Sequence, residues 1–371
     1  MIKNITVLAG DGVGAEITQQ SIKVLNAVAL HFNHQFIYTD CLIGAVAIAK
    51  TGNSLPDKTI EICLAADAIL FGTVENASYN NGLANKVYPQ EGLLRLRKIL
   101  GLFAEIRPLT IYSSLQHLSP LKSKIIAGVD LIIFSELSAG NNNSAIDLNI
   151  THASLPNVDE SLTINIEKIA HAAFSAASKR RKKLTLVDKV NVYKTPVVWR
   201  NVVKKVGLNY PDVVVNFLPL ENAMRQIMLN PKQFDIILTD NLLGDILNDE
   251  ATNISGSSGL LPCASIGNII GLFSPVNGID FLAEGKDIAN PIGSILSVAM
   301  MLDYFNLREE AQMVRDAVEW TIESLFVSKD LDPINFYFTS TIGELISEYI
   351  GGRISGRVNW ENIELRKSTI I

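Results

Sequence analysis

Residues 234–250 read FDIILTDNLLGDILNDE and place an acidic helical pattern directly after an apolar run. The apolar run at residues 234–238 is typical of a buried strand, and a helical pattern follows it at residues 244–254. Asp245 and Asp249 are four positions apart, so on a helix they share one face. Like charges there are unfavourable without a cation, and Mg²⁺ or Mn²⁺ prefers carboxylate oxygens. The stretch therefore predicts a metal site after a buried strand. The alternative is a capping Asp240 followed by an ordinary solvated acidic face.

Elsewhere, short apolar runs alternate with longer helical patterns along the chain. Apolar runs occur at residues 5–8, 68–71, 131–134, 184–187 and 213–217, and helical patterns at residues 15–32, 164–179 and 292–305. This alternation predicts an α/β protein whose sheet carries helices on its faces. No linker rich in Pro, Gly or Ser separates two halves. Two domains would therefore share strands or cross over more than once.

The composition of the 371 residues excludes several classes of protein. Hydrophobic residues make up 48% and charged residues 19%, which argues against a disordered chain. The net charge of -6 argues against a nucleic-acid partner, which requires a basic face. The 3 cysteines include no C-x-x-C pair, so neither a disulfide framework nor a zinc site is indicated. Without a signal-peptide pattern or an apolar run of membrane-spanning length, we expect a cytoplasmic protein with no membrane partner.

Other segments carry candidate chemistry. The glycines at residues 10–14 have the spacing G-x-G-x-G, which favours a structural turn over a dinucleotide-binding loop. Lys189 follows an apolar strand, where α/β folds place ligands, and a lysine beside a metal can act as a base. Arg97 and Arg107 would suit a clamp for carboxylates, and Glu221 would add a third oxygen to the metal site. Taken singly, Lys189, Arg97 and Arg107 are each more typical of an ordinary surface position.

Together and in this order, the segments resemble the isocitrate/isopropylmalate family of β-decarboxylating dehydrogenases over nearly the whole chain. The most specific match joins residues 230–250 to the Gly-rich residues 255–267. The resemblance implies an isopropylmalate/isocitrate dehydrogenase-like α/β fold, in which two α/β domains share a large mixed sheet, and not a Rossmann fold. It assigns residues 1–102 and 256–371 to domain 1, with both chain ends and the nucleotide side. Residues 103–255 form domain 2, with the dimerisation, metal and substrate side.

The resemblance also implies a reaction and roles for individual residues. The family oxidises a 2-hydroxy acid with NAD and releases the β-carboxylate as CO₂, and its isopropylmalate branch serves leucine biosynthesis. Asp245 and Asp249 would hold Mg²⁺ or Mn²⁺ together with Glu221 of the partner subunit. Lys189 of the partner subunit would be the general base, so the resemblance implies a homodimer with shared active sites. The remaining implied contacts are Arg97 and Arg107 to the substrate carboxylates, Leu93, Leu94 and Val192 to the isopropyl group, and Asn191, Asn277, Gly278, Leu282 and Asn290 to NAD.

The chain departs from the family pattern at several of these contacts. Ser135 stands where the family has a third carboxylate-binding arginine, and Asn142 stands where it has the tyrosine that protonates the enol. An amide has no titratable proton to give, so that step would need water. Leu282 replaces an aspartate that binds ribose, and Asn277 replaces a histidine that meets adenine. Since leucine cannot accept a hydrogen bond from a ribose hydroxyl, we expect weaker NAD binding.

Three hypotheses follow from this combination. The leading one is an isopropylmalate-type, NAD-dependent dehydrogenase, supported by the intact lysine, arginine and aspartate positions. The second is a related oxidoreductase with a changed acid or cofactor. The third is a non-catalytic paralogue that acts as a binding or regulatory subunit, favoured by the joint changes at Ser135, Asn142 and Leu282.

Overall fold

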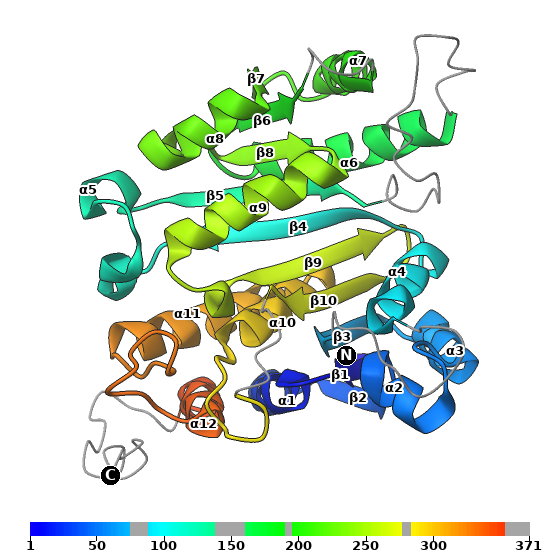
Figure 1. Ribbon diagram of the computed structural model, residues 1–371, viewed down its shortest axis with the longest axis vertical. Helices are drawn as coiled ribbons and strands as arrows, with labels where there is room; N and C mark the ends of the chain where they lie inside the picture. The colour runs from blue at the N-terminus through cyan, green and yellow to red at the C-terminus, as the bar shows by residue number, and fades with distance from the viewer. Residues whose placement is uncertain (75–87, 138–159, 190–194, 277–282, 353–371) are drawn as a thin grey trace.

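A ten-stranded mixed sheet runs through the computed structural model from one end to the other (Figure 1). The structure describes residues 1–74, 88–137, 160–189, 195–276 and 283–352. The strands are β1 Ile2–Gly10, β2 Gln35–Asp40, β3 Ala68–Thr73, β4 Leu102–Thr110, β5 Asp130–Glu136, β6 Lys183–Asp188, β7 Val214–Pro219, β8 Ile236–Thr239, β9 Pro262–Gly267 and β10 Gly271–Pro275. The helices are α1 Gly14–Phe32, α2 Gly44–Thr51, α3 Asp57–Ala65, α4 Pro89–Ile99, α5 Ser123–Ile126, α6 Glu160–Ser178, α7 Thr195–Gly207, α8 Leu220–Leu229, α9 Asn241–Ser255, α10 Ile292–Tyr304, α11 Arg308–Glu323 and α12 Thr339–Ile350.

The strand order explains why the sheet is mixed. It runs β2-β1-β3-β10-β9-β4-β5-β8-β6-β7. The neighbours at both ends pair in parallel, whereas β9 pairs antiparallel with β10 and β4, and β4 pairs antiparallel with β5. This arrangement confirms the expected α/β fold with one large mixed sheet.

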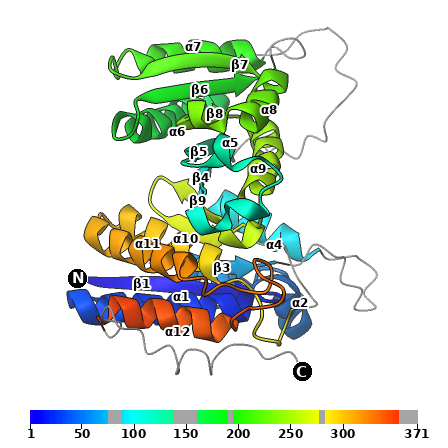
Figure 2. The same ribbon diagram turned by 90° about the vertical axis from the view of Figure 1, so that its left-hand side faces the viewer.

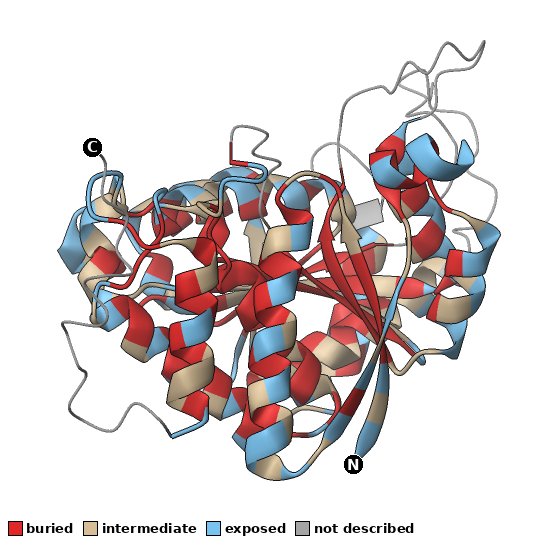
Figure 3. Ribbon diagram, turned by 90° about the horizontal axis from the view of Figure 1, so that it is seen from below, coloured by how far each residue is buried: buried red, intermediate tan, exposed pale blue. Residues whose placement is uncertain are grey.

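Helices cover both faces of the sheet (Figure 2). Near β6 and β8, helices α6 and α7 pack on one face, and α8 and α9 pack on the other. Near β3, alternate residues enter different cores, since Ala68 and Leu70 pack with α1 and α10 whereas Ile69 and Phe71 pack with α3 and α4. The inner strands β3, β6 and β8 are therefore buried on both faces (Figure 3), which is why they read as continuous apolar runs in the sequence. None of the described helices has the length and apolar character that crossing a membrane requires.

Strands β2, β4, β9 and β10 were not among the predicted strands, and the residues of β4 explain its omission. Glu105 and Arg107 interrupt its apolar pattern although Glu105 is buried, so the segment lacks the apolar run that marks inner strands such as β3 and β8. The proposed domain division falls at the start of β4 and the end of α9. It stays a prediction, because the sheet continues across both boundaries.

Candidate functional site

Arg97 and Arg107, the two predicted carboxylate-binding residues, lie together around a buried carboxylate of the chain itself. Arg97 projects from α4 and Arg107 from β4, and both meet Glu105 of β4. Arg97 Nη2 lies 3.0 Å from Glu105 Oε1, and Arg107 Nη2 lies 2.6 Å from Glu105 Oε2. The Glu105 side chain is 3% exposed and each arginine side chain is 21% exposed. The two guanidinium groups therefore form a pair, and Glu105 bridges it.

The strand register determines the surroundings of this bridge. Successive side chains on a strand point to opposite faces, so Glu105 and Arg107 share the face that α9 covers. Glu105 is paired in register with Ser135 on β5 and with Ser265 on β9. Burial raises the pKa of Glu105, but attraction to Arg107 and Arg97 outweighs it and holds that pKa below its ordinary value. The bridge is therefore a buried carboxylate that stays ionised.

Cys263 on β9 borders the same group. Burial, reinforced by the Glu105 carboxylate, raises the pKa of its thiol to about 12. A thiol in this state is protonated at neutral pH and is a poor nucleophile or metal ligand. Cys263 is buried and therefore belongs to the packing around the bridge.

Helix α9 carries the predicted metal-binding carboxylates. Its N-cap is Asp240, whose Oδ1 accepts a hydrogen bond from the Leu243 backbone N–H at 2.9 Å. One turn further, Asp245 and Asp249 lie on the exposed side of the helix. Asp245 Oδ1 lies 3.8 Å from Arg107 Nη2, and loss of solvation followed by the charge of Glu105 raises the pKa of Asp245. The helix thus has both the cap and the paired carboxylates that the sequence predicted as alternatives.

Close packing fixes the position of α9 relative to β5. A Cβ atom at Gly244 would lie 2.3 Å from Cβ and 3.0 Å from Oγ of Ser135. Both residues are buried, so a larger residue at Gly244 would have to move the helix away from the sheet. The glycine thereby brings the next residue, Asp245, close to Arg107.

Lys189 and Glu221 form a second group. Lys189 follows β6, Glu221 begins α8, and Lys189 Nζ lies 3.0 Å from Glu221 Oε1. Just before the lysine, the buried Asp188 accepts hydrogen bonds from Arg200 Nε at 2.6 Å and from Arg200 Nη2 at 3.0 Å. With side-chain exposures of 37% for Lys189 and 59% for Glu221, this pair faces solvent.

Within one chain the candidate metal site is incomplete. Over the described ranges, no group of three or more His, Cys, Asp or Glu side chains is placed to hold a metal ion. Asp245 and Asp249 alone offer the oxygen ligands that Mg²⁺ or Mn²⁺ prefers, while Glu221 is paired with Lys189. The two aspartates fit a hard divalent cation that takes its further ligands from elsewhere.

Several predicted contacts lie on the periphery of the site. Leu93 on α4 is partly buried, whereas Leu94 is 54% exposed. Asn290 is buried, and it accepts a hydrogen bond from the Ile292 N–H at 3.0 Å and donates one to Asp330 at 3.1 Å, which holds the start of α10. The predicted contacts Asn142, Asn191, Val192, Asn277, Gly278 and Leu282 lie outside the described residues.

The glycine-rich turn after β1 has a clear structural role. Asp11 accepts hydrogen bonds from the Ala45 and Val46 backbone N–H groups at 2.9 and 3.0 Å, at the start of α2. Gly10 has φ +74, and a Cβ atom there would lie 1.8 Å from the Thr73 carbonyl oxygen. These contacts agree with the expected structural turn.

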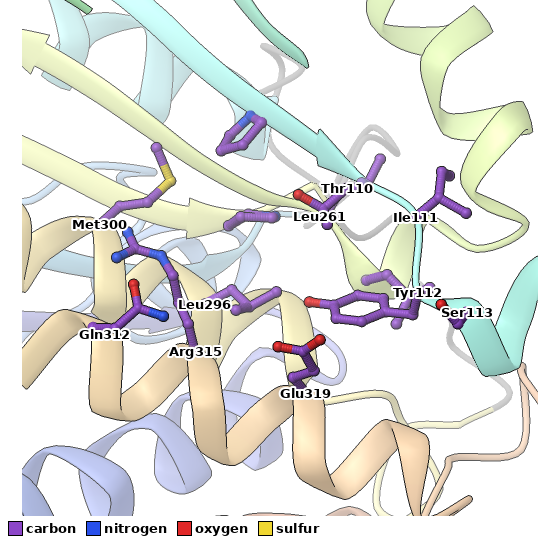
Figure 4. Close-up of a pocket in the computed structure, with 13 residues that line it drawn as sticks. Thr110, Ile111, Tyr112, Ser113, Leu261, Leu296, Met300, Gln312, Arg315 and Glu319 are labelled. Atoms are coloured by element: carbon purple, nitrogen blue, oxygen red, sulfur yellow. The ribbon is translucent and has the colours of Figure 1, made fainter. Parts of the chain in front are cut away.

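A cavity of about 260 Å³ lies on the other face of the sheet (Figure 4). Leu261, Leu296 and Met300 line it together with the polar Gln312, Arg315 and Glu319. Pro108 and Thr110 of β4 line it as well, and strand alternation directs them away from the face of Glu105 and Arg107. The cavity is therefore separate from the arginine and aspartate group.

Comparison with known proteins assigns the chain to a family. The family model described as isocitrate/isopropylmalate dehydrogenase matches residues 4–346. The chain belongs to this family. The 3-isopropylmalate dehydrogenase of Bacteroides fragilis (strain YCH46) is 38% identical over 356 residues, which cover 93% of this chain and 98% of that protein. The 3-isopropylmalate dehydrogenase of Thermotoga maritima is 42% identical over 354 residues, which cover 92% and 97%.

Solved structures agree with the family assignment. Isocitrate dehydrogenase from Methylococcus capsulatus superposes with a TM-score of 0.78 at 28% identity, over 94% of this chain and 99% of that one. The apo form of a β-decarboxylating dehydrogenase from Thermococcus kodakarensis gives a TM-score of 0.75 at 28% identity, over 94% and 96%. The predicted family and fold are thereby confirmed.

Glu105 is the residue of this candidate site that the sequence analysis missed. The signal was present, because Glu105 and Arg107 are two apart and so share one face of a strand. A carboxylate flanked by two candidate clamp arginines, eight positions after one and two before the other, could have been read as their partner.

Proposed function

We propose that the protein oxidises and decarboxylates a 2-hydroxy acid, with NAD as oxidant and Mg²⁺ or Mn²⁺ as cofactor, and that 3-isopropylmalate is its substrate in leucine biosynthesis. The observation that carries the proposal is the 3.8 Å approach of Arg107 Nη2 to Asp245 Oδ1. This contact brings a guanidinium group suited to binding a substrate carboxylate close to an aspartate suited to binding a divalent cation. The names of the relatives from Bacteroides fragilis and Thermotoga maritima support the choice of substrate.

The described residues suit distinct parts of this reaction. Asp245 and Asp249 would hold the cation, and Arg97 and Arg107 would orient the acid through a carboxylate. When bound, the cation would polarise the hydroxyl and the ketone that replaces it, and NAD would accept the hydride. Lys189 would take the hydroxyl proton on Nζ, which requires its amine to be neutral. If Glu221 turned toward the cation, Lys189 would lose its ion pair with that carboxylate.

We include a homodimer in the proposal. Glu221 and Lys189 are paired and exposed in one chain, and Asp245 and Asp249 lack a third acidic neighbour there. A second copy that presents Lys189 and Glu221 to these aspartates would complete the ligand set. A cytoplasmic location belongs to the same proposal, because NAD and a soluble organic acid are its substrates.

The direct test follows NADH formation by the purified protein with Mn²⁺, NAD and 3-isopropylmalate. We expect metal-dependent turnover that falls by about 10²–10⁴-fold in Lys189→Met, because general-base catalysis is worth that much. Asp249→Asn should lose both turnover and Mn²⁺ binding. The matched control is Asp212→Asn, which changes a surface carboxylate that is 76% exposed and pairs with Lys182.

The companion variant Ser135→Arg/Asn142→Tyr separates this proposal from the non-catalytic alternative. Turnover by the unmodified chain supports the proposal and requires another proton donor in place of a tyrosine. No turnover by that chain, with activity in the double variant, contradicts catalysis here and favours a binding or regulatory subunit. If neither the unmodified chain nor the double variant forms NADH, a changed acid or cofactor is favoured.

A further inference from the structure

The cavity on the opposite face of the sheet from the candidate site combines charged and apolar side chains. Its volume of about 260 Å³ lies just under the roughly 300–1,000 Å³ of pockets that hold drug-sized ligands. Figure 4 shows Arg315 and Glu319 projecting from α11 toward the side that holds Leu296 and Tyr112. Most other side chains of the lining are apolar, so the cavity suits a small molecule with a charged end and an apolar end.

Glu319 offers this cavity a negative charge that no side chain neutralises. Residues four apart on a helix are neighbours, so Arg315 would be its ordinary partner on α11. Arg315 Nη2 instead pairs with Asp303 on α10. In the part of the chain that the structure describes, no cationic side chain forms an ion pair with Glu319. Its carboxylate is therefore available to a cationic group of a ligand.

Arg315 can still bind an anion. A guanidinium group carries several N–H donors in a fixed plane, and Asp303 engages the Nη2 atom. The Arg315 side chain is 36% exposed, so a ligand can reach its other nitrogen atoms. A carboxylate is the anion that best matches this planar arrangement of donors. The helix thus presents one site for an anion and, one turn further, one site for a cation.

Tyr112 supplies a polar atom beside these charges. Its ring lines the cavity, and within the described ranges its hydroxyl forms no hydrogen bond. Burial, followed by the charge of Glu319, raises the pKa of Tyr112, so the hydroxyl stays protonated close to that carboxylate. A protonated hydroxyl can accept a hydrogen bond from an ammonium group or donate one to a carboxylate.

The apolar end of the cavity is formed by aliphatic side chains. Leu261 and Leu296 are buried and Met300 is partly buried, and all three line the cavity. An aliphatic group that enters would remove further apolar surface from water, which is favourable. Since no charged side chain of the lining lies outside α11, a third charge on the ligand would have no partner there.

We propose that this cavity is a binding site for a zwitterionic α-amino acid with an aliphatic side chain. The ammonium group faces Glu319, the carboxylate faces Arg315, and the aliphatic side chain packs on Leu296 and its apolar neighbours. An α-amino acid carries its two charges close together, and side chains four apart on a helix are likewise adjacent. The site is distinct from the arginine and aspartate group, which lies on the other face of the sheet, so it does not depend on the proposed reaction.

Calorimetric titration of the full-length protein with four compounds tests the proposal. L-Leucine carries both charges and an aliphatic side chain, 4-methylpentanoate lacks the ammonium group, 3-methylbutylamine lacks the carboxylate, and L-alanine lacks most of the side chain. We expect L-leucine to bind at least about 3-fold more tightly than each of the others, because each of them loses one contact. Equal affinity for L-leucine and any of the three, or no binding of L-leucine up to about 10 mM, overturns the proposal.

Two variants assign the charged contacts. Glu319→Gln should weaken L-leucine binding by about 3–10-fold and leave 4-methylpentanoate binding unchanged, because that acid has no ammonium group. Arg315→Gln should weaken the binding of both compounds, since both carry a carboxylate. Equal weakening of both compounds by Glu319→Gln, or no effect of either variant, contradicts the proposal.

The matched controls are Glu309→Gln and Arg308→Gln, which change exposed residues in the first turn of the same helix. Both should leave the affinity for L-leucine unchanged. Asp249→Asn should leave it unchanged as well, and a loss of L-leucine binding in that variant would place the ligand at the candidate metal site and overturn the proposal. If a cavity variant does not fold, the four compounds on the unmodified chain decide.

Discussion

At the scale of single residues, the site is organised by buried charges that satisfy one another. Glu105 lies between two guanidinium groups, and Asp188 is held by Arg200 immediately before Lys189. Burying a charge is costly, and removing one partner exposes the other to that cost. Breaking either ion pair would leave a buried charge without a partner. The pair around Glu105 therefore holds Arg107 in place, and the Asp188–Arg200 pair holds the backbone beside Lys189.

Glu105→Gln should lower the free energy of unfolding by about 3 kcal/mol at pH 7, because two buried guanidinium groups lose their counter-charge. Urea unfolding of both proteins across pH measures the effect. The pKa of Glu105 is lowered in the fold, so its carboxylate stabilises the protein above the unfolded pKa of about 4.3. That contribution is lost as the pH falls through the folded pKa. The stability difference should therefore shrink in acid, and a difference that grows below pH about 4 would contradict this assignment.

Arg200→Gln should destabilise the protein by about 1–3 kcal/mol, because it leaves the buried Asp188 without its two hydrogen bonds. The arginine is 30% exposed, so solvent screening keeps the effect below that of a fully buried pair. The control Lys205→Gln breaks a 3.5 Å pair with Glu167 in which the lysine is 74% exposed, and it should cost about 0–0.5 kcal/mol. Equal effects of both changes in urea unfolding would show that Asp188 does not depend on Arg200.

Sequence spacing could predict residues that lie close together through local helical geometry, but it did not predict contacts between different elements. Asp245 and Asp249 could be assigned to one helix face because the helical period is local. A carboxylate clamp of Arg97 and Arg107 was proposed from their residue type and again from the family resemblance, but their shared partner Glu105 was not foreseen. The contact between Arg97 on α4 and Glu105 on β4 depends on how the helix packs on the sheet. That packing does not correspond to a fixed number of residues between the two positions, so it could not be recognised in the sequence.

At the scale of elements, the contact between α9 and β5 sets the position of the carboxylates proposed to bind the metal. Gly244 lets the helix approach the sheet at Ser135, and Asp240 fixes where the helix begins. The alternation of buried strands and helices predicted most inner elements. Strand β4 was not predicted, because the charged Glu105 and Arg107 interrupt the apolar run by which the other strands were recognised.

Gly244→Ala should destabilise the protein by about 1–3 kcal/mol, since its Cβ would overlap the Ser135 side chain and push α9 outward. The displacement should also separate Asp245 from Arg107 and weaken Mn²⁺ binding. Thermal unfolding and Mn²⁺ titration measure the two effects. Asn253→Ala, an exposed position on the same helix, serves as the control and should change stability by about 0.5 kcal/mol or less. A Gly244→Ala protein as stable as this control would refute the close-packing argument.

At the scale of the whole molecule, the candidate site consists of two groups. The first contains Arg97, Arg107, Asp245 and Asp249, and the second is the Lys189–Glu221 ion pair. The α/β class could be predicted from the alternation of apolar runs and helical patterns along the chain. The specific fold with one large mixed sheet was predicted from the family resemblance. The joining of the two groups depends on a second copy, so it stays a prediction.

Complementation between two impaired variants tests whether two copies of the chain share one active site. Alone, Lys189→Met should keep at most about 1% of the unmodified rate of NADH formation, and Asp249→Asn should lose that activity. Mixed dimers should regain one complete site, because Asp249 of the first variant meets Lys189 of the second. Co-folding equal amounts should therefore restore about a quarter of unmodified activity, as half the dimers are mixed and each has one intact site. Activity that stays absent in the mixture, while the unmodified chain turns over under the same conditions, would contradict a site shared between two copies.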